Sequence, residues 1–296
     1  MKLITCIYKN KKIPAVLSQD GKEVFPFFVL SKFEGLNSMN DLIETGTSET
    51  LEKIEKAAEK LKGQGVKTEE ITLAAPIPEP KQDVICLGIN YTEHAKESAR
   101  YKGIDFEENR QYPVYFSKRV NEALPHMGKI ALTGSQTVNL DYEAELAFII
   151  GKDAENVKAE NAEDYIFGYT VINDISARDL QARHKQWYAA KSLTGFCPMG
   201  PCIVTKDEIP LGTALKITSK VNGELRQNSS TDKMIFDIPY IIEELSSYFC
   251  LKAGTVISTG TPSGVGMGFN PPRFLNHGDR VDCEIEKIGT LTTFIV

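Results

Sequence analysis

The stretch LDYEAELAFIIG spans residues 140–151 and joins an acidic half to a strongly apolar half. An apolar run of this length that ends at a glycine is typical of a buried β-strand. Side chains alternate between the two faces of a strand, so Glu143 and Glu145 should point the same way, and Asp141 should join them at the start of the strand. The sequence therefore predicts two or three carboxylates on one face.

Such a group of carboxylates indicates a cation. Like charges that are partly shielded from water repel each other and raise each other's pKa unless a positive charge neutralises them. Mg²⁺ and Ca²⁺ prefer oxygen ligands, and Mn²⁺ accepts them. The alternative is a solvent-facing edge strand with acidic residues, which is the commoner situation for an isolated Glu-x-Glu pattern.

A second acidic position strengthens the metal hypothesis. The segment GYTVINDISARD, residues 168–179, is an apolar strand that ends at Asp174 and is followed by a polar turn. Side chains at such strand ends commonly project into functional sites. Asp174 would complete a set of three oxygen ligands with Glu143 and Glu145. Arg178 and Asp179 could instead form a local ion pair that fixes the turn, and for Asp179 we favour this structural role.

The rest of the chain predicts an α+β fold that is mainly β. Residues 1–30 predict several short strands, and Leu51, Ile54, Ala58 and Leu61 recur at helical spacing. Three prolines in AAPIPEP, residues 74–80, favour an extended connection. We therefore expect a small N-terminal domain (1–72), a proline-rich linker (73–82) and a larger domain (83–296). Its strands are predicted in segments rich in β-branched residues: DVICLG (83–88), YTVIND (169–174), KITSKVNGEL (216–225), GTVISTG (254–260) and RVDCEIE (280–286).

Composition narrows the classes of function. The 296 residues carry a net charge of −6 without a long basic run, so nucleic acid is not expected as a partner. The six cysteines form no C-x-x-C pair, and the N-terminal segment lacks the apolar stretch of a signal peptide. No apolar run approaches the ~18 residues that span a bilayer. We expect a soluble cytoplasmic protein with reduced thiols.

Six motifs in order resemble the fumarylacetoacetate hydrolase superfamily, and the resemblance covers residues 75–296. They are GINYTEHAKE (88–97), LDYEAELAFIIG (140–151), GYTVINDISARDLQ (168–181), KSLTGFCPMGP (191–201), VNGELRQ (221–227) and STGTPSGVG (258–266). Two further segments, RHKQW (183–187) and GFNPPRFLNHGD (268–279), are most similar to bacterial oxaloacetate decarboxylase-like members and to the mammalian domain-2 proteins.

The resemblance implies a catalytic domain built as a mixed β-sandwich roll, a small N-terminal α/β domain, and a homodimer. It also implies Mg²⁺ or Mn²⁺ held by Glu143, Glu145 and Asp174. Family substrates are small keto or enol acids, and the reactions are carbon–carbon hydrolysis, decarboxylation or isomerisation. In each case a metal chelated by the 2-oxo acid end would stabilise an enolate.

Three residues are predicted to be catalytic. His94 and Glu97 lie at positions i and i+3, so a helix would bring them onto one face, where the carboxylate can orient the imidazole. In related hydrolases this pair activates water or moves a proton. By resemblance, Lys191 points a cation at the substrate's oxygens. The alternatives are a histidine on a surface helix and a solvated lysine.

Four residues are predicted to bind substrate. Gln181 and Arg178 match positions that contact substrate in relatives, and Gly260 and Thr261 would offer a backbone N–H and a hydroxyl to a carboxylate. Reading residues 264–268 as a dinucleotide fingerprint is disfavoured because no helix signals follow them.

Two features bear on the substrate. Ile89 stands where acylpyruvate hydrolase and oxaloacetate decarboxylase members carry Arg or Lys, and where isomerase-like members more often have an aliphatic residue. This departure puts recognition of a substrate carboxylate in doubt. Residues 101–112, YKGIDFEENRQY, are charged and weakly patterned, and we interpret them as a lid.

These observations predict a metal-dependent lyase or hydrolase acting on a small 2-oxo or 1,3-dicarbonyl acid. Oxaloacetate decarboxylation is the best single hypothesis, with acylpyruvate hydrolysis as an additional activity. One alternative is an enzyme of the 2-hydroxyhepta-2,4-diene-1,7-dioate isomerase or 5-oxopent-3-ene-1,2,5-tricarboxylate decarboxylase type, which Ile89 favours. Another is a non-catalytic metal-binding scaffold.

Overall fold

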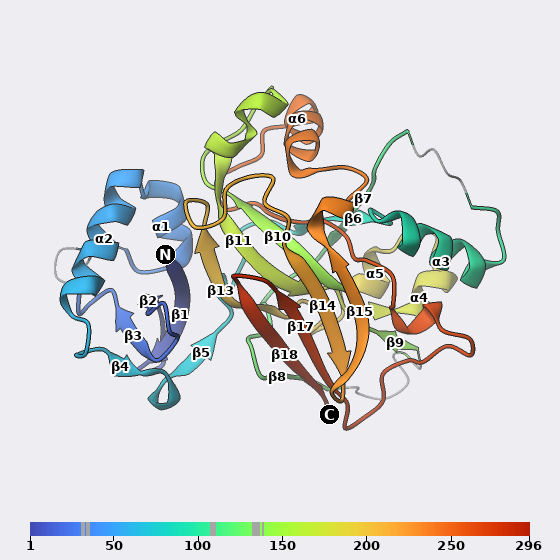
Figure 1. Cartoon of the computed structure of the whole chain (residues 1–296), viewed down its shortest axis with the longest axis horizontal. Helices are drawn as coiled ribbons and strands as arrows, with labels where there is room; N and C mark the ends of the chain where they lie inside the picture. Colours follow the sequence, from blue (N-terminus) through green and yellow to red (C-terminus); the bar gives the residue numbers. More distant parts are fainter. Residues whose placement is uncertain (31–32, 34–35, 107–110, 132–136, 138) are drawn as a thin grey trace.

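Two β-sheets form the centre of the protein (Figure 1). The computed structural model spans residues 1–296 and describes all of them except 31–32, 34–35, 107–110, 132–136 and 138. The larger sheet contains β1 (Lys2–Tyr8), β2 (Lys11–Leu17), β3 (Glu23–Pro26), β4 (Val66–Lys67), β5 (Thr72–Ala74), β6 (Val84–Gly88), β7 (Val114–Lys118), β10 (Ala144–Ile150), β11 (Ile166–Asn173), β13 (Met199–Thr205) and β16 (Val256–Ser258). Its order is β4-β3-β2-β1-β13-β11-β10-β16-β6-β7, and β5 also pairs with β1.

The smaller sheet packs against the middle of the larger one. Its strands are β8 (Gly128–Ile130), β14 (Lys216–Val221), β15 (Glu224–Ser230), β17 (Arg280–Ile285) and β18 (Gly289–Ile295), in the order β15-β14-β17-β18-β8. Along β17, Val281, Cys283 and Ile285 are buried while their neighbours are more exposed, the alternation of a half-buried strand. By contrast, all residues of β10 and β11 are buried, as expected between packed layers. Strands β9 (Leu140–Asp141) and β12 (Ser176–Ala177) pair separately.

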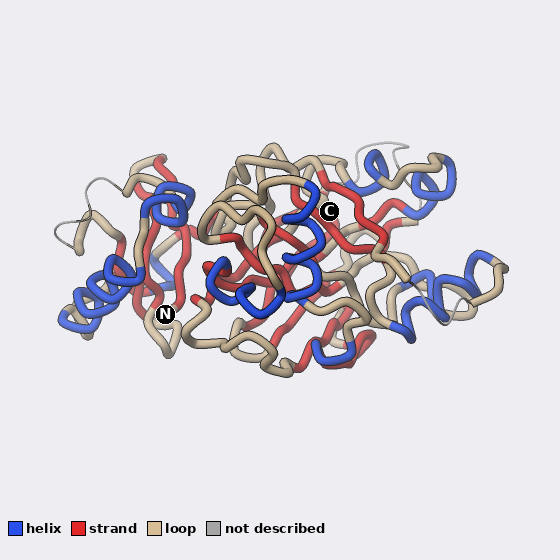
Figure 2. The backbone as a smooth tube through the Cα atoms, turned by 90° about the horizontal axis from the view of Figure 1, so that it is seen from above, coloured by secondary structure: helices blue, strands red, loops and turns tan. Residues whose placement is uncertain are grey.

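Helices lie at both ends of the sheets and, at α6 (Ile238–Tyr248), above their middle (Figure 1). They are α1 (Met39–Thr45), α2 (Ser48–Lys60), α3 (Thr92–Lys102), α4 (Arg178–Arg183), α5 (Tyr188–Lys191) and α6 (Ile238–Tyr248), with short 3₁₀ helices at η1 (Thr68–Glu70), η2 (Ala159–Tyr165), η3 (Thr231–Lys233) and η4 (Gly266–Gly268). Helices α1 and α2 flank the N-terminal strands, whereas α3, α4 and α5 gather at the opposite end (Figures 1 and 2). No helix in the described part of the chain is both long and apolar enough to span a membrane.

The α+β, mainly β fold class predicted from the sequence is confirmed. The predicted helix corresponds to α2, which begins after the N-cap Thr47, whose side chain accepts a hydrogen bond from the Thr50 N–H. The predicted strand segments also form strands. Because β1 pairs with β13, the N-terminal strands continue the sheet of the larger region. The division into residues 1–72, 73–82 and 83–296 stays a prediction.

The pairing of β10 with β11 positions the acidic residues. The two strands are antiparallel, so the start of β10 lies beside the end of β11, and Ala144 pairs with Asn173. Glu143 directly precedes β10 and Asp174 directly follows β11. The Asp174 N–H donates a hydrogen bond of 2.8 Å to the Glu143 carbonyl. Two carboxylates distant in sequence are therefore brought together by the ladder itself.

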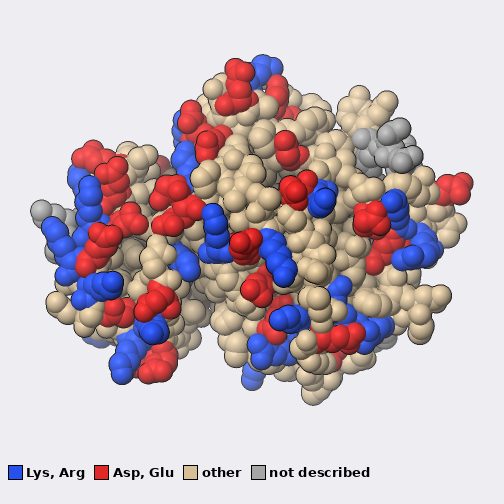
Figure 3. Space-filling model, in the orientation of Figure 1, with Lys and Arg blue, Asp and Glu red and all other residues tan. Residues whose placement is uncertain are grey.

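Charged side chains are interspersed on the surface. On the face shown in Figure 3, Lys and Arg side chains lie among Asp and Glu side chains and form no broad basic patch. The six cysteines are all free thiols. The expectation that nucleic acid is not a partner stays a prediction.

Candidate metal centre and active site

The structure brings the three predicted metal ligands together. Glu143, Glu145 and Asp174 each place a carboxylate oxygen within 4.8 Å of the others. All three side chains are buried, with at most 5% of each residue exposed. We call this triad, together with its basic neighbours Lys118, Arg178 and Lys191, the cavity floor.

Asp141 does not share the face of Glu143 and Glu145, so that part of the sequence prediction is wrong. The regular alternation starts only at Ala144, where β10 begins, and Asp141 belongs to the separate strand β9. Its carboxylate accepts hydrogen bonds from the Gly266 N–H at 2.6 Å and the Met267 N–H at 3.0 Å. Asp141 therefore anchors a turn instead of joining the triad.

Three buried cations contact the carboxylates of the floor. The Lys191 Nζ lies 2.8 Å from Glu143 Oε2 and 2.6 Å from Asp174 Oδ2. The Arg178 Nη2 lies 2.6 Å from the other oxygen of Glu143, and the Arg178 Nε donates to Asp141 at 2.9 Å. Lys118 pairs with the second oxygen of Asp174 and donates to the Ile175 carbonyl. Arg178 thus contacts two buried carboxylates beside the triad.

The charged neighbours of the two glutamates of the floor shift their pKa values in opposite directions. Burial would raise the pKa of Glu143, but the charges of Lys191 and Arg178 outweigh it and lower that pKa well below its usual range. At Glu145, burial together with the charges of Asp174 and Glu143 raises the pKa well above its usual value. The Ser258 hydroxyl and the Gly260 N–H donate to Glu145 at 2.6 and 3.0 Å, without reversing that shift.

The floor fits a divalent cation. Carboxylate oxygens are the donors that hard divalent ions prefer, and the triad converges on one point. Burial and then the charges of Asp174 and Glu143 raise the pKa of Glu145, and a bound cation would oppose both effects. Four buried carboxylates meet three buried cations, namely Asp141, Glu143, Glu145 and Asp174 with Lys118, Arg178 and Lys191. The buried triad is therefore consistent with a bound divalent metal ion.

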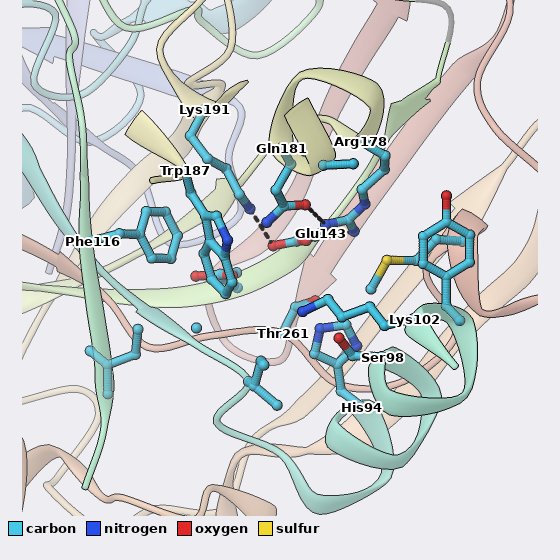
Figure 4. Close-up of a pocket in the computed structure, with 17 residues that line it drawn as sticks. His94, Ser98, Lys102, Phe116, Glu143, Arg178, Gln181, Trp187, Lys191 and Thr261 are labelled. Atoms are coloured by element: carbon cyan, nitrogen blue, oxygen red, sulfur yellow. Dashed lines mark hydrogen bonds and ion pairs between the residues drawn. The ribbon is translucent and has the colours of Figure 1, made fainter. Parts of the chain in front are cut away.

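A cavity of about 230 Å³ opens above the floor. Glu143, Glu145, Arg178 and Lys191 line it on one side and α3 lines it on another (Figure 4). The wall between them is largely apolar and is formed by Leu87, Ile89, Phe116 and Trp187.

Helix α3 contributes the predicted His94–Glu97 pair. The His94 Nδ1 lies 3.1 Å from Glu97 Oε2, and both side chains are buried. The Gly264 N–H donates to Glu97 Oε1 at 3.0 Å, which fixes the carboxylate from a distant loop. Since Nδ1 faces Glu97, the other ring nitrogen is the one that can act in the cavity, which His94 lines. We call His94, Glu97 and the cavity-lining residues that follow them on α3 the α3 wall.

The loop after β16 donates hydrogen bonds to carboxylates of the protein's own side chains, whereas the sequence predicted a substrate carboxylate there. Its N–H groups at Gly260, Gly264 and Gly266 hold Glu145, Glu97 and Asp141. A Cβ at Gly268 would lie 1.7 Å from Glu97 Oε1, so a glycine is needed there. The glycine-rich motif thus positions three acidic side chains around the cavity.

Of the four predicted substrate-binding residues, Arg178, Gln181 and Thr261 line the same cavity, and Gly260 is not part of its lining. Gln181 accepts a hydrogen bond of 3.0 Å from Arg178. Thr261 donates to the Ala144 carbonyl at 2.8 Å, and Gly260 gives its N–H to Glu145.

Sequence reasoning missed several residues of the site. Lys118 is completely buried, yet in the sequence it is one of two adjacent basic residues at the end of β7 and nothing local distinguishes it. Asn90 joins three segments, because its amide donates to the Phe236 and Thr259 carbonyls and accepts from the Phe236 N–H. Its place inside the motif GINYTEHAKE, residues 88–97, was a usable signal.

Trp187 was noted only as part of a family motif, but it is a central part of the apolar wall. Its ring packs over Gly88, where a Cβ would come within 2.4 Å of it. Phe116 meets the ring edge-on, with centroids 5.2 Å apart. Ile89 has φ of +58°, an uncommon conformation for a β-branched residue, and its side chain lines the same wall.

The predicted lid is described only in part. Tyr101 and Lys102 end α3 and line the cavity, and Gly103 closes the helix in the left-handed conformation. Residues 107–110 lie outside the described residues.

The chain is similar to proteins of one family. The family model described as fumarylacetoacetate (FAA) hydrolase C-terminal matches residues 83–296. The oxaloacetate tautomerase YisK of Bacillus subtilis is 47% identical over 226 residues, which make up 76% of this chain and 73% of that protein.

Solved structures show the same likeness over the whole chain. Fumarylacetoacetate hydrolase from Exiguobacterium antarcticum superposes with a TM-score of 0.82 at 35% identity and covers 100% of this chain and 99% of that chain. Maleylpyruvate hydrolase from Sphingobium sp. SYK-6, in complex with manganese(II) and pyruvate, gives a TM-score of 0.74 at 25% identity, with coverages of 100% and 99%.

Proposed function

Since the chain belongs to the fumarylacetoacetate hydrolase family, we propose that it is a Mg²⁺- or Mn²⁺-dependent enzyme that interconverts the enol and keto forms of a small 2-oxo acid. Oxaloacetate is the proposed substrate. The name of the Bacillus subtilis relative and the arrangement of proton-transferring groups in the cavity support this choice over the decarboxylation predicted from the sequence.

One observation carries the proposal. The His94 imidazole, oriented by Glu97, lines the same small cavity as Glu143 and Glu145. Enolisation needs both a cationic centre for the oxygens of a 2-oxo acid and a positioned base for the neighbouring carbon. The cavity floor and the α3 wall supply these two requirements from different segments of the chain.

The floor is suited to hold the oxygens of the substrate. When bound to Glu143, Glu145 and Asp174, a divalent ion would act as a Lewis acid toward the carboxylate and 2-oxo oxygens and favour the enolate. Lys191 is held beside two of these ligands and adds positive charge where the oxygen of an enolate would lie.

His94 moves the proton at carbon. In the direction from enol to keto form, the enol O–H gives up its proton to solvent, the C2=C3 double bond becomes single as C2=O forms, and C3 gains a proton. His94, with Nδ1 against Glu97, can deliver that proton from its other ring nitrogen and is reprotonated afterwards. In the reverse direction it removes the proton from C3. Glu97 keeps the ring oriented and stabilises its charged form.

Decarboxylation of oxaloacetate is a second candidate that uses the same enolate. The observation that favours it is the apolar wall of Leu87, Ile89 and Trp187, because a carboxylate poorly solvated in such surroundings loses CO₂ more readily. In that reaction the bond between C3 and its carboxyl carbon breaks, and His94 would protonate the resulting enolate. The two candidates differ in whether carbon is lost.

The deciding experiment follows enol oxaloacetate by ultraviolet absorbance and its products by NMR, with Mg²⁺ or Mn²⁺ present. We expect rapid conversion of enol to keto form with all four carbons retained, and loss of this rate on chelation of the metal. Glu143→Ala should be inactive because a triad ligand is missing. Asp153→Ala, in an exposed ion pair with Lys252, is the matched control and should behave as the unaltered protein.

Two results would change the conclusion. Release of pyruvate at the rate of enol loss would establish the decarboxylase instead. Conversion no faster than with buffer and metal, for oxaloacetate and for other small 2-oxo acids, would reject both candidates.

A further inference from the structure

We propose that Gln227 is a positioning residue for the metal centre and that it makes the cavity floor favour Mg²⁺ over Ca²⁺. Gln227 lies on β15 in the smaller sheet and is completely buried. Its amide binds the backbone between Glu143 and Glu145 and the loop after β16. This inference rests on the proposed function, because it assumes that a divalent ion occupies the triad.

The backbone between the two glutamates runs beyond the neighbouring strand on one side. Ala144 stands between Glu143 and Glu145 and begins β10. Strand β16 pairs with β10 only from Ala147 to Ile149, so this ladder does not reach Ala144. Buried peptide groups require hydrogen-bond partners, and other groups must supply them here. A rotation of the peptide groups on either side of Ala144 would turn both glutamate side chains.

Gln227 and Thr261 supply the missing partners. Gln227 Oε1 accepts a hydrogen bond of 3.0 Å from the Ala144 N–H, and its Nε2 donates to Thr261 Oγ1 and to the Pro262 carbonyl, both at 2.7 Å. The Thr261 hydroxyl then donates to the Ala144 carbonyl at 2.8 Å, which closes a ring of hydrogen bonds. We call Gln227, Thr261 and the Ala144 backbone the peptide clamp. The orientation of the amide is fixed, because only its oxygen can accept and only its nitrogen can donate.

The peptide clamp gives the Thr261 hydroxyl a different role from the one predicted. Thr261 lines the cavity (Figure 4), and the sequence predicted that its hydroxyl binds a substrate carboxylate. A hydroxyl has one proton to donate, and Thr261 donates it to Ala144. The geometry therefore points to support of the two glutamates, and the two roles give different experimental results.

Rigid support of the ligands favours the smaller ion. Mg²⁺ requires a near-ideal octahedral arrangement of oxygens at short distances, whereas Ca²⁺ accepts longer and more variable distances. The Asp174 N–H holds the Glu143 carbonyl from the side of β11, and the peptide clamp holds Ala144 from the other side. Loss of the clamp would let the two glutamates spread apart. Mg²⁺ should therefore depend on Gln227 more strongly than Ca²⁺ does.

The first test measures ion binding without turnover. Mn²⁺ would be titrated by electron paramagnetic resonance, in which the free ion gives a much stronger signal than the bound ion, and Mg²⁺ or Ca²⁺ would then displace it. Gln227→Met keeps the length of the side chain and loses all three hydrogen bonds. Its affinity for Mg²⁺ should fall by roughly tenfold to a hundredfold, as is usual for residues that support metal ligands. Its affinity for Ca²⁺ should fall much less.

Thr5→Val is the matched control for general loss of stability. Thr5 is buried in β1 and does not line the cavity, and its hydroxyl donates to the Pro76 carbonyl at 2.7 Å. The variant loses a comparable buried hydrogen bond and should keep the ratio of Mg²⁺ to Ca²⁺ affinity. Equal losses for the two ions in Gln227→Met, or the same change of ratio in Thr5→Val, would overturn the proposal.

The second test uses Thr261 and does not depend on whether Gln227→Met folds. Thr261→Val keeps the shape of the side chain but removes the hydroxyl of the peptide clamp, so the ratio of Mg²⁺ to Ca²⁺ affinity should fall. Thr261→Ser keeps the hydroxyl and should restore most of that ratio. An unchanged ratio in Thr261→Val would contradict the clamp.

Oxalate binding separates the two roles of Thr261. Trp187 is the single tryptophan of the chain and lines the cavity, so its fluorescence reports on ligands there. Oxalate mimics the 2-oxo acid end of a substrate and would be titrated at saturating Mg²⁺. Thr261→Val should bind it as tightly as the unaltered protein does. Weaker oxalate binding together with an unchanged ion ratio would assign the hydroxyl to the substrate and overturn the proposal.

These measurements separate the inference from the proposed function. If the unaltered protein does not enolise oxaloacetate but its ion preference depends on Gln227, the proposed function fails and the positioning role stands. If it enolises oxaloacetate and Gln227→Met keeps the ion preference of the unaltered protein, the positioning role fails and the proposed function stands.

Discussion

The cavity floor and the α3 wall are both built from charged side chains, yet they obtain their geometry in different ways. On the floor, every carboxylate is buried and is held by partners far away in the sequence, such as Ser258 for Glu145. On the α3 wall, His94 and Glu97 are three residues apart and meet because a helix brings them together. The floor depends on the whole fold, whereas the wall depends mainly on one helix and one loop.

This difference indicates that the floor mainly affects the free energy of unfolding and the α3 wall mainly affects the rate of catalysis. Removing one member of a set of buried, mutually compensating charges is strongly destabilising, because it leaves the other members uncompensated. A histidine oriented at the edge of a cavity contributes mainly to the rate of proton transfer. Variants of the floor should therefore affect stability and metal binding, and variants of the α3 wall should affect turnover.

The largest effect is expected for His94→Gln. Loss of the proton-transferring ring should lower kcat by about 10²–10⁴-fold, the usual contribution of general acid–base catalysis. Metal affinity and stability should change little, because His94 is not one of the triad. Steady-state kinetics and calorimetric titration with Mn²⁺ would check this. A parallel loss of metal affinity would show that floor and wall are not independent.

Asp174→Ala is the corresponding test of the floor, and it measures stability. The variant leaves the buried Lys118 without its carboxylate partner and leaves Lys191 with Glu143 alone, so the free energy of unfolding should fall by about 3–5 kcal/mol. Urea unfolding in the presence of a chelator measures this. Asp153→Ala removes an exposed partner of Lys252 and should cost far less. If the two variants lost similar amounts of unfolding free energy, burial of the ion pairs on the floor would not be the cause of the loss.

Gly268→Ala tests how the loop supports the α3 wall. The new methyl group would overlap the Glu97 carboxylate, so His94 should lose its orientation and kcat should fall by roughly a hundredfold, as expected for a misplacement of about 1 Å. Gly212→Ala, where a methyl group meets no atom within 4 Å, introduces backbone strain without touching the site. It should leave kcat unchanged, and a similar loss of kcat in both variants would argue for a general effect of instability.

The smallest effect is expected for Ser258→Ala. Its hydroxyl donates to Glu145 at 2.6 Å, so its loss should weaken metal affinity by about tenfold, as is common for residues that hydrogen-bond to a ligand. The rate at saturating metal should be nearly normal. Titration of activity against Mn²⁺ concentration would reveal the shift, and unchanged affinity would remove Ser258 from the support of the floor.

The sequence predicted the parts of the site that depend on local pattern. Strand periodicity placed Glu143 and Glu145 on one face, and helical spacing paired His94 with Glu97. It failed at Asp141, because the break between β9 and β10 interrupts the alternation. It also missed Lys118, whose burial follows from its place beside Asp174 and not from its neighbours in sequence.

The sequence by itself thus determined the mainly β fold, the acidic residues of the triad, and the histidine and glutamate of α3. Glu143 with Glu145, and His94 with Glu97, follow from side-chain spacing along a strand or helix, and Asp174 follows from its position at the end of a strand. Only the tertiary structure decided which carboxylate keeps its charge, where Lys118 and Asp141 point, and what the glycine-rich loop holds. These properties depend on burial and on partners such as Gly264, which is 167 residues from Glu97. The energies of buried charges are set by distances in space, which no local pattern encodes.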